Sequence, residues 1–355
     1  MTFKFRHFAF FLVAIVLACG CRTTSDRSSS AAGVPNARTA WMPQARWGVM
    51  THYLADWRQR VDHVPMSVTN WNGLVDNFDV DGLADQLKSV GAGYLILTIG
   101  QNSGYYDCPN PTYDRLTGIR PSKCSHRDLI LDMAHALQKR GLRLIVYLPA
   151  GAPGGDRAAD KALDYQRGPN RNAEFQVKWE AIIRDWSLRW GTNVSGWWFD
   201  GCYWPNMMYR YATPPNFRSF AAAARAGNPN AVVAFNPGVV DRALSITPYE
   251  DYTAGEMNDL DRAMIRQTGP PGYMDGAKVH FLSFLGTRWG MGTPRFSTEQ
   301  AVTYTRNIVR EGGLMTWDTP VQKNGTISQP FLDQLKAIGQ AVREETNQSS
   351  SIPSN

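Results

Sequence analysis

Seven short apolar runs recur along the chain between residues 46 and 318, each four or five residues long. Most are continuous, with no alternation of apolar and polar positions, which is the pattern of parallel strands covered on both faces. The runs occupy residues 48–52, 94–98, 144–148, 196–199, 231–235, 279–282 and 314–317, and a weaker eighth candidate lies at 245–252. The sequence therefore predicts a mainly parallel sheet.

Helical periodicity fills the segments between these runs. Apolar residues return at intervals of three and four over 83–90, 129–137, 179–188 and 332–342, as on the buried face of an amphipathic helix. Alternating strands and helices predict an α/β fold, and eight such units would close a (β/α)8 TIM-like barrel. An open doubly wound sheet is the alternative, but no Gly-x-Gly-x-x-Gly follows the first strand, so a dinucleotide site has no support.

The N-terminus has the features of an export signal. Lys4 and Arg6 precede an uninterrupted run of 11 apolar residues at 8–18. A helix that spans a bilayer needs about 20 such residues, so residues 1–18 are predicted to be a signal peptide. The run ends in Ala18-Cys19, which resembles a bacterial lipobox whose cysteine is lipidated, and Cys21 is the second choice. Ordinary cleavage near Ala18 is the alternative.

The ends of the chain are predicted to lie outside the folded domain. Residues 19–40 are rich in Ser, Thr, Ala and Gly and suit a flexible tether, and residues 346–355 form a polar tail that we expect to be disordered. The barrel is then a single domain at 41–345. An exported protein of this kind would be lipid-anchored in a bacterial envelope, and its only contact with the membrane would be the N-terminal lipid.

Composition narrows the class of protein. With 43% hydrophobic and 19% charged residues, the chain of 355 residues is neither disordered nor a small disulfide scaffold. The net charge of +6 is spread without a basic run, so nucleic-acid binding is not indicated. The 12 Trp, 14 Tyr and 15 Phe could form core, but aromatic faces also stack on the apolar C–H surfaces of sugars.

Three cysteines lie in the body of the chain. Cys108 and Cys124 flank a loop of 15 residues, and in an oxidising compartment a disulfide between them would contribute roughly 3 kcal/mol. Two unpaired thiols are the alternative, and the spacing does not fit a zinc site. Cys202 is expected to pack in the core. His52, His126 and His280 lie far apart in the sequence, so we predict no metal site.

Candidate chemistry gathers at the predicted strand ends, because the active site of such a barrel lies at the C-terminal ends of its strands. These ends carry His52, Gln101, Asn102, Asp200, Asn236, an acidic stretch at 250–261, and Asp318. Two separated carboxylates at one barrel mouth are what glycoside hydrolysis requires. The strongest motif is Trp197-Trp198-Phe199-Asp200-Gly201, in which the strand delivers a carboxylate and glycine permits a sharp turn. An aspartate that caps the next helix is the structural alternative.

The ordered set of motifs resembles glycoside hydrolase family 29, the α-L-fucosidases. Residues 48–53 are similar to the first strand of that family, and residues 127–129 to its second helix. Trp198-Phe199-Asp200-Gly201 matches its nucleophile motif, and residues 312–327 resemble its eighth-strand segment and the turn after it. The likeness runs in order from Arg46 to about Val342.

This resemblance implies a retaining exo-glycosidase that removes terminal α-L-fucosyl or closely related residues from glycans by double displacement, without a cofactor. Asp200 would be the nucleophile. Glu256 would be the acid/base, with Glu250 as second choice. The sugar would be bound by His52, Gln101, Asn102, Trp198, Trp289 and Asp318.

Departures from the family pattern leave other functions open. Gln101 and Asn102 stand where the family usually has two histidines that contact fucose, Trp317-Asp318 replaces a Leu-Asn pair, and the usual C-terminal β-sandwich is missing. Amides hydrogen-bond but carry no charge and reach differently. The alternatives are therefore the same mechanism on another sugar, such as an α-L-galactoside, or a non-catalytic surface lipoprotein that binds glycans.

Overall fold

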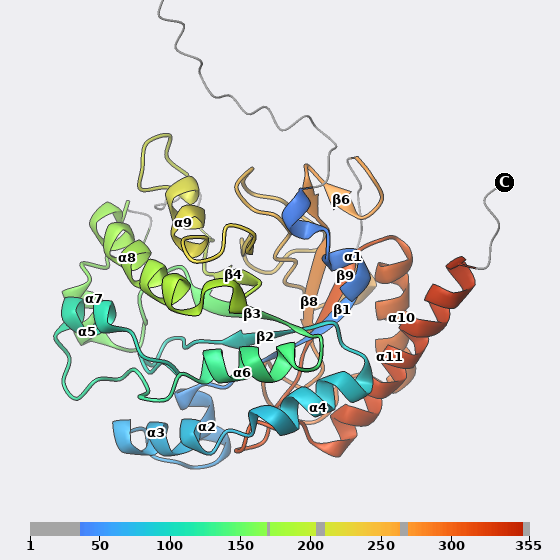
Figure 1. Ribbon diagram of the computed structural model, residues 1–355, viewed down its shortest axis with the longest axis horizontal. Helices are drawn as coiled ribbons and strands as arrows, with labels where there is room; N and C mark the ends of the chain where they lie inside the picture. Colours follow the sequence, from blue (N-terminus) through green and yellow to red (C-terminus); the bar gives the residue numbers. More distant parts are fainter. Residues whose placement is uncertain (1–35, 169–170, 204–209, 263–268, 351–355) are drawn as a thin grey trace, which may run out of the picture.

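The strands form one curved parallel sheet in the computed structural model, which describes residues 36–168, 171–203, 210–262 and 269–350 (Figure 1). The strands are β1 (Trp47–Thr51), β2 (Tyr94–Thr98), β3 (Arg143–Pro149), β4 (Gly196–Asp200), β5 (Val232–Phe235), β8 (His280–Phe284) and β9 (Leu314–Asp318). Their order is β5-β4-β3-β2-β1-β9-β8, and every neighbouring pair is parallel. All seven predicted runs are confirmed as strands of an α/β, TIM-like barrel.

An irregular segment, 251–257, occupies the wall between β5 and β8. Asp251 N donates to Val233 O of β5, and Leu282 N of β8 donates to Gly255 O, both at 2.8 Å. Only isolated parallel bridges form along it, at Tyr252 and Glu256. The weak strand predicted at 245–252 is therefore wrong in two respects: the wall segment lies later in the chain, at 251–257, and it is not a regular strand. Gly255 explains part of this, since its φ of +63° is unsuited to a regular strand.

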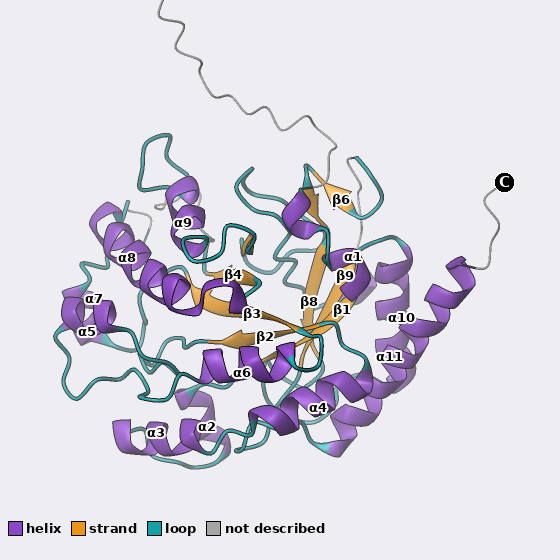
Figure 2. Cartoon of the chain, in the orientation of Figure 1, coloured by secondary structure: helices purple, strands orange, loops and turns teal. Residues whose placement is uncertain are grey.

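Helices surround the sheet (Figure 2). They are α1 (Met42–Ala45), α2 (Ala55–Val61), α3 (Val68–Asp76), α4 (Val80–Val90), α5 (Pro111–Thr117), α6 (Leu129–Gln138), α7 (Arg157–Ala162), α8 (Ala173–Trp190), α9 (Phe217–Ala224), α10 (Thr298–Arg310) and α11 (Gln329–Ser350), with 3-10 turns η1 (Ala37–Thr39), η2 (Gly191–Asn193) and η3 (Leu260–Arg262). The four predicted helical segments correspond to α4, α6, α8 and α11. Asp79 and Asp128 cap α4 and α6 by accepting backbone N–H bonds, which fixes where these helices begin.

The strands separate two apolar layers. Met50, Ile96, Tyr147 and Trp198 belong to a cluster inside the barrel, while Val49, Leu95, Leu97, Val146 and Trp197 pack outward against the helices. Successive strand residues point to opposite faces, so both faces are apolar and the runs read as continuous. Apart from the short hairpin of β6 (Tyr273–Met274) and β7 (Ala277–Lys278), the described ranges contain no second sheet and no C-terminal β-sandwich.

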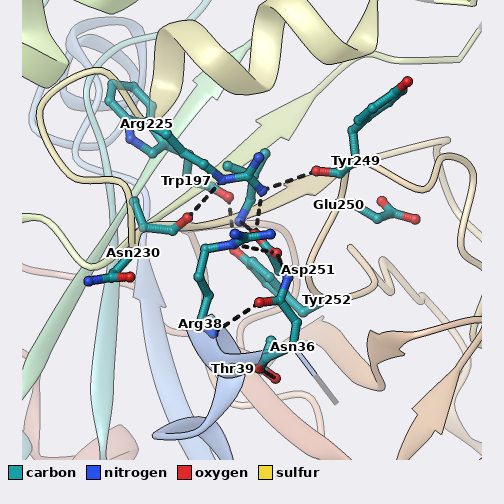
Figure 3. Close-up of polar contacts among 12 residues, drawn as sticks. Asn36, Arg38, Thr39, Trp197, Arg225, Asn230, Tyr249, Glu250, Asp251 and Tyr252 are labelled. Carbon is teal, nitrogen blue, oxygen red and sulfur yellow. Dashed lines mark hydrogen bonds and ion pairs between the residues drawn. The ribbon is translucent and has the colours of Figure 1, made fainter. Parts of the chain in front are cut away.

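The N-terminal residues are bound to the barrel wall where a tether is predicted. Figure 3 shows Asp251 between Arg38 and Arg225. One carboxylate oxygen accepts bonds from Asn36 Nδ2 at 2.7 Å and Arg38 Nε at 2.9 Å, and the other accepts from Arg225 Nη2 at 2.5 Å. Because Asp251 is fully buried, these donors compensate its charge. The tether boundary at residue 40 is therefore wrong, and residues 36–40 belong to the fold.

The C-terminal boundary also differs from the prediction. Helix α11 continues to Ser350, so the first part of the expected tail at 346–355 is helical. The predicted signal peptide, Cys19 and residues 351–355 lie outside the described residues. In the described ranges, no helix combines the length and apolarity needed to cross a membrane.

The predicted disulfide is absent from the structure. Cys108 and Cys124 are both buried free thiols, as is Cys202. Each of the first two has a polar neighbour of its own, Asp107 beside Cys108 and Ser122 beside Cys124. Burial raises the pKa of all three thiols, so they stay neutral and pack as small apolar groups.

Candidate active site

A cavity of about 210 Å³ opens at the C-terminal ends of the strands. Its lining combines two carboxylates with aromatic and apolar side chains: Met50, His52, Trp57, Gln101, Tyr147, Trp198, Asp200, Glu256, Leu282 and Trp289. His52, Gln101, Trp198, Asp200, Glu256 and Trp289 are all predicted site residues, and the fold brings them together. We refer to this cavity as the sugar pocket.

Asp200 ends β4 and is held by four donors. Tyr147 Oη donates to Oδ2 at 2.6 Å, while Asn236 Nδ2, Tyr203 Oη and the Gly201 N–H donate to Oδ1 at 2.8–2.9 Å. Both carboxylate oxygens are thereby oriented at the pocket wall. These contacts do not correspond to a helix cap, which was the structural alternative for Asp200.

Glu256 faces Asp200 across one amide. Since Asn236 Nδ2 lies 2.9 Å from Asp200 Oδ1 and 2.6 Å from Glu256 Oε2, these two oxygens are at most 5.5 Å apart. Burial, together with the negative charge of Asp200, raises the pKa of Glu256 to about 7. The Asn236 hydrogen bond and His52 act in the opposite direction. Glu256 can therefore hold a proton near neutral pH.

Glu250, the other predicted acid, lies away from this pocket. Its oxygens accept backbone N–H bonds from Ile246 at 2.7 Å and Phe235 at 3.4 Å, so it holds the loop after β5. Burial raises its pKa to about 8. Its contacts make Glu250 a structural residue.

Asp318, which was predicted to bind the sugar, is fully buried at the end of β9 and does not line the sugar pocket. One oxygen bonds His52 Nδ1 at 2.7 Å, and the other accepts the Gly290 N–H. Burial by itself would lower the pKa of His52, but the charge and hydrogen bond of Asp318, together with the charges of Asp200 and Glu256, outweigh it and raise that pKa. Asp318 thus acts through His52, whose Nε2 is the ring nitrogen left for a ligand.

Aromatic rings form the walls of the sugar pocket. Tyr147 stacks on Trp198 with ring centroids 5.4 Å apart, and His52 stacks on Trp57 at 5.6 Å. Trp57 Nε1 donates to Trp289 O at 2.9 Å, which ties the loop after β8 to α2. Such rings offer apolar faces to the C–H surface of a sugar.

The two amides that replace the family histidines lie in different places. Gln101 Nε2 donates to Tyr147 Oη at 2.6 Å, and its buried Oε1 has no hydrogen-bond partner among the described residues. A buried acceptor in this state suits a ligand hydroxyl. Asn102 lies outside the sugar pocket and lines a neighbouring cavity of about 400 Å³ together with Gln101, Asp200 and Tyr203, so its role in substrate binding stays a prediction.

The sequence from residue 35 to residue 346 matches the family model described as Alpha-L-fucosidase. The chain belongs to the α-L-fucosidase family. It has the barrel fold of that family, as the sequence motifs indicate. No curated protein matches the sequence significantly.

Solved structures share this fold at low identity. The endo-fucoidan hydrolase MfFcnA9 of glycoside hydrolase family 107 is 21% identical with a TM-score of 0.64, over 86% of this chain and 64% of its own. The α-L-fucosidase AlfC from Lactobacillus casei, solved with α-L-fucose product, is 18% identical with a TM-score of 0.59, over 88% and 100%. The Thermotoga maritima α-fucosidase is 19% identical with a TM-score of 0.58, over 89% and 75%. The chain spans less than two thirds of the length of MfFcnA9, and at these identities the likeness concerns the fold.

Sequence patterns left parts of this fucosidase-family site unassigned. Asn236 stands at a predicted strand end, but nothing in the sequence shows that its amide joins two carboxylates. Tyr147 occupies an inward position of β3, where any large residue would read as core. Trp57 and Tyr203 lie on α2 and on the loop after β4, and no periodicity marks them. Among the described residues, no group of histidine, cysteine or acidic side chains could hold a metal ion.

Proposed function

We propose that this protein hydrolyses terminal α-L-fucosides, or closely related glycosides, with retention of anomeric configuration. The observation that supports the proposal is the shared amide of Asn236, which keeps Asp200 Oδ1 and Glu256 Oε2 at most 5.5 Å apart. Retaining glycosidases have carboxyl groups about 5–5.5 Å apart, whereas inverting enzymes need roughly 6.5–9.5 Å to admit a water molecule.

In the first step Asp200 attacks the anomeric carbon and forms a glycosyl ester, while the bond to the leaving oxygen breaks. Glu256 donates its proton to that oxygen, which its raised pKa of about 7 allows. In the second step Glu256 takes a proton from water as the water displaces Asp200 from the sugar. Esterification removes the Asp200 charge, which is one cause of the raised Glu256 pKa, so the ester form favours Glu256 as a base.

The shape of the sugar pocket supports action on a terminal residue. Its volume of about 210 Å³ is below the roughly 300–1,000 Å³ of sites for drug-sized ligands, and it suits one sugar ring. His52 Nε2 and Gln101 Oε1 are the groups available for ring hydroxyls, and Trp198 and Trp289 are available for its apolar face. These contacts would select the sugar, since buried polar groups penalise a ligand that leaves them unpaired.

An α-L-galactoside is the second candidate substrate. L-Galactose has one hydroxyl, at C6, that L-fucose lacks. The buried Gln101 Oε1, without a partner among the described residues, is an acceptor that could take an additional hydroxyl donor. The same retaining mechanism would apply to both sugars.

Measuring the first-formed product tests the mechanism. Aryl α-L-fucoside and α-L-galactoside are incubated with the enzyme, and proton NMR follows the anomeric signal before mutarotation. We expect the α-anomer first. The β-anomer first would contradict retention, and turnover of neither glycoside would favour a non-catalytic glycan-binding protein.

We also propose that the protein is exported and lipid-anchored through Cys19. The support is the basic start, the 11-residue apolar run and Ala18-Cys19. Mass spectrometry of detergent-extracted protein should find an acylated N-terminal cysteine. A mature N-terminus without acyl mass would exclude the anchor.

A further inference from the structure

Arg295 binds two segments of the barrel wall from outside the sugar pocket. It lies in the loop between β8 and α10 and does not line the pocket. Its Nε donates to Phe284 O at 2.8 Å, its Nη1 to Asn258 O at 3.2 Å and its Nη2 to Ser283 Oγ at 3.0 Å. Because the guanidinium is a rigid planar fork, these bonds fix the end of β8 and the segment after Glu256 relative to each other.

The segment that follows Glu256 is held at two consecutive carbonyls. Met257 O accepts the Ser283 Oγ–H at 2.7 Å, and this hydroxyl oxygen in turn accepts an N–H of Arg295. Asn258 O accepts another N–H of the same guanidinium directly. The first two carbonyls after Glu256 are therefore fixed by one side chain, one of them through Ser283 and the other without an intermediary.

Glu256 has little regular structure of its own to fix it. Gly255, directly before it, has a φ of +63°, and the only pairing of Glu256 with β8 is an isolated bridge to Leu282. In a regular ladder, hydrogen bonds on both sides of a residue set the direction of its side chain. Here the direction of the carboxyl depends on the Asn236 amide and on the contacts of the residues that follow.

The same guanidinium supports an aromatic wall of the sugar pocket. Its central carbon lies 3.5 Å from the ring centroid of Phe284 and 4.3 Å from that of Phe296. The Phe284 ring packs against Trp289 with centroids 4.6 Å apart, and Trp289 lines the pocket. Arg295 thus lies behind two parts of the site, Trp289 and the segment that carries Glu256, without reaching the pocket itself.

We propose that Arg295 is a positioning residue for the acid/base. By fixing the two carbonyls after Glu256 against the end of β8, it keeps the carboxyl at the distance from the leaving oxygen that proton transfer requires. This proposal rests on the proposed function, since it assumes that Glu256 protonates that oxygen. It goes beyond that function by assigning the placement of the acid to a side chain outside the pocket.

Two substrates with the preferred sugar separate the work of the acid from the rest of the reaction. A phenyl glycoside has a poor leaving group and depends on protonation, whereas a glycosyl fluoride depends on it far less. For Arg295→Gln we expect kcat/KM for the phenyl glycoside, divided by that for the fluoride, to fall about tenfold, because a displaced acid transfers its proton poorly. A change in sugar binding through Trp289 affects both substrates and cancels in this ratio.

Arg295→Lys keeps the positive charge but not the planar fork. Its ratio should therefore lie between those of Arg295→Gln and the wild type. If Arg295→Gln fails to fold, Arg295→Lys carries the same test, and a ratio equal to that of the wild type then contradicts the proposal.

Arg127→Gln is the matched control. Arg127 Nη1 donates to three backbone carbonyls at and after the end of α3, those of Val75, Asp76 and Phe78. Its loss should lower stability in a similar way, since it also removes a guanidinium that binds backbone. Because these carbonyls belong to α3 and the residues after it, and not to the segment that carries Glu256, we expect the ratio to equal that of the wild type.

A double-mutant cycle with Glu256→Ala shows whether Arg295 acts through the acid. In that background Arg295→Gln should not lower the ratio further, because the group that Arg295 positions is gone. The assignment is overturned if Arg295→Gln lowers kcat/KM for both substrates equally, or lowers the ratio as much in the Glu256→Ala background. It is also overturned if Arg127→Gln lowers the ratio as much. If Glu256→Ala alone leaves the ratio unchanged, or the wild type cleaves neither substrate, the proposed function itself fails and the assignment fails with it.

Discussion

Asp318 and His52 form a buried pair at the floor of the sugar pocket, with Oδ1 and Nδ1 2.7 Å apart. The second Asp318 oxygen accepts the Gly290 N–H, so one carboxylate supports two walls of the pocket. An asparagine, which the family pattern has at this position, would carry no charge. The aspartate favours a protonated imidazole, which leaves Nε2 as a donor toward the ligand.

Asp318→Asn should therefore change substrate binding and its dependence on pH. The variant loses the main cause of the raised His52 pKa, while burial, which lowers that pKa, remains. We expect KM to rise about tenfold near neutral pH with a smaller change in kcat, because one charged hydrogen bond is worth roughly 1.5–3 kcal/mol. A full pH profile of KM checks this, and a profile parallel to that of the wild type would contradict it.

The same pair predicts a pH-dependent contribution to stability. Because the native pKa of His52 is raised above 6.5, the pairing contributes fully below that pH, and the contribution is lost as pH rises through the native pKa. The difference in unfolding free energy between wild type and Asp318→Asn should shrink from about pH 6 upward. Denaturant titrations at several pH values measure it, and a constant difference would show that only the Gly290 bond matters.

Glu256 should set the alkaline limb of activity. Its carboxyl must be protonated in the first step, so kcat/KM should decline as pH rises through about 7. Glu256→Ala should flatten this limb, slow substrates with poor leaving groups most, and regain rate with added azide. Glu250→Gln is the control, because Glu250 binds backbone N–H groups away from the pocket. A flattened limb in the control alone would reassign the acid.

Asn236→Ala should uncouple the two carboxylates. The hydrogen bond that lowers the Glu256 pKa would be lost, so the alkaline limb should move to higher pH, while kcat/KM falls by about 10²-fold. Asn228→Ala provides a comparison, since Asn228 is a buried amide that donates to Val194 O. It should lower stability without moving the pH profile. Equal profiles for the two variants would argue against a role for the Asn236 bridge.

The strands and helices of this fold could be predicted from the sequence, because continuous apolar runs and helical periodicity follow directly from burial. Asp200 could also be predicted as a site residue, since a strand-end carboxylate within Trp-Phe-Asp-Gly is a local signal. The bridge through Asn236 and the indirect role of Asp318 could not be predicted, because both depend on contacts between strands far apart in the chain. The segment at 251–257 could not be predicted for a related reason: its irregular hydrogen bonds to β5 and β8 give no periodic pattern.

Gly255 offers a test of how that segment places Glu256. Its φ is +63°, and an added Cβ would lie 1.9 Å from His280 O. Gly118 has a similar φ of +66° with open space around the same position. Gly255→Ala should therefore cost at least about 2 kcal/mol more unfolding free energy than Gly118→Ala, from overpacking beyond shared backbone strain. Equal losses of unfolding free energy for the two variants in denaturant titration would mean that the segment at 251–257 adjusts to the added Cβ without further cost.

The proposed retaining mechanism requires a covalent bond between Asp200 and the sugar. A 2-deoxy-2-fluoro glycosyl fluoride of the preferred sugar should inactivate the enzyme, because fluorine slows hydrolysis of the intermediate more than fluoride loss slows its formation. Peptide mass spectrometry should then place one fluoroglycosyl group on Asp200, and Asp200→Asn should not be labelled. A label on any other residue, or Asp200→Asn with near wild-type turnover, would contradict the account.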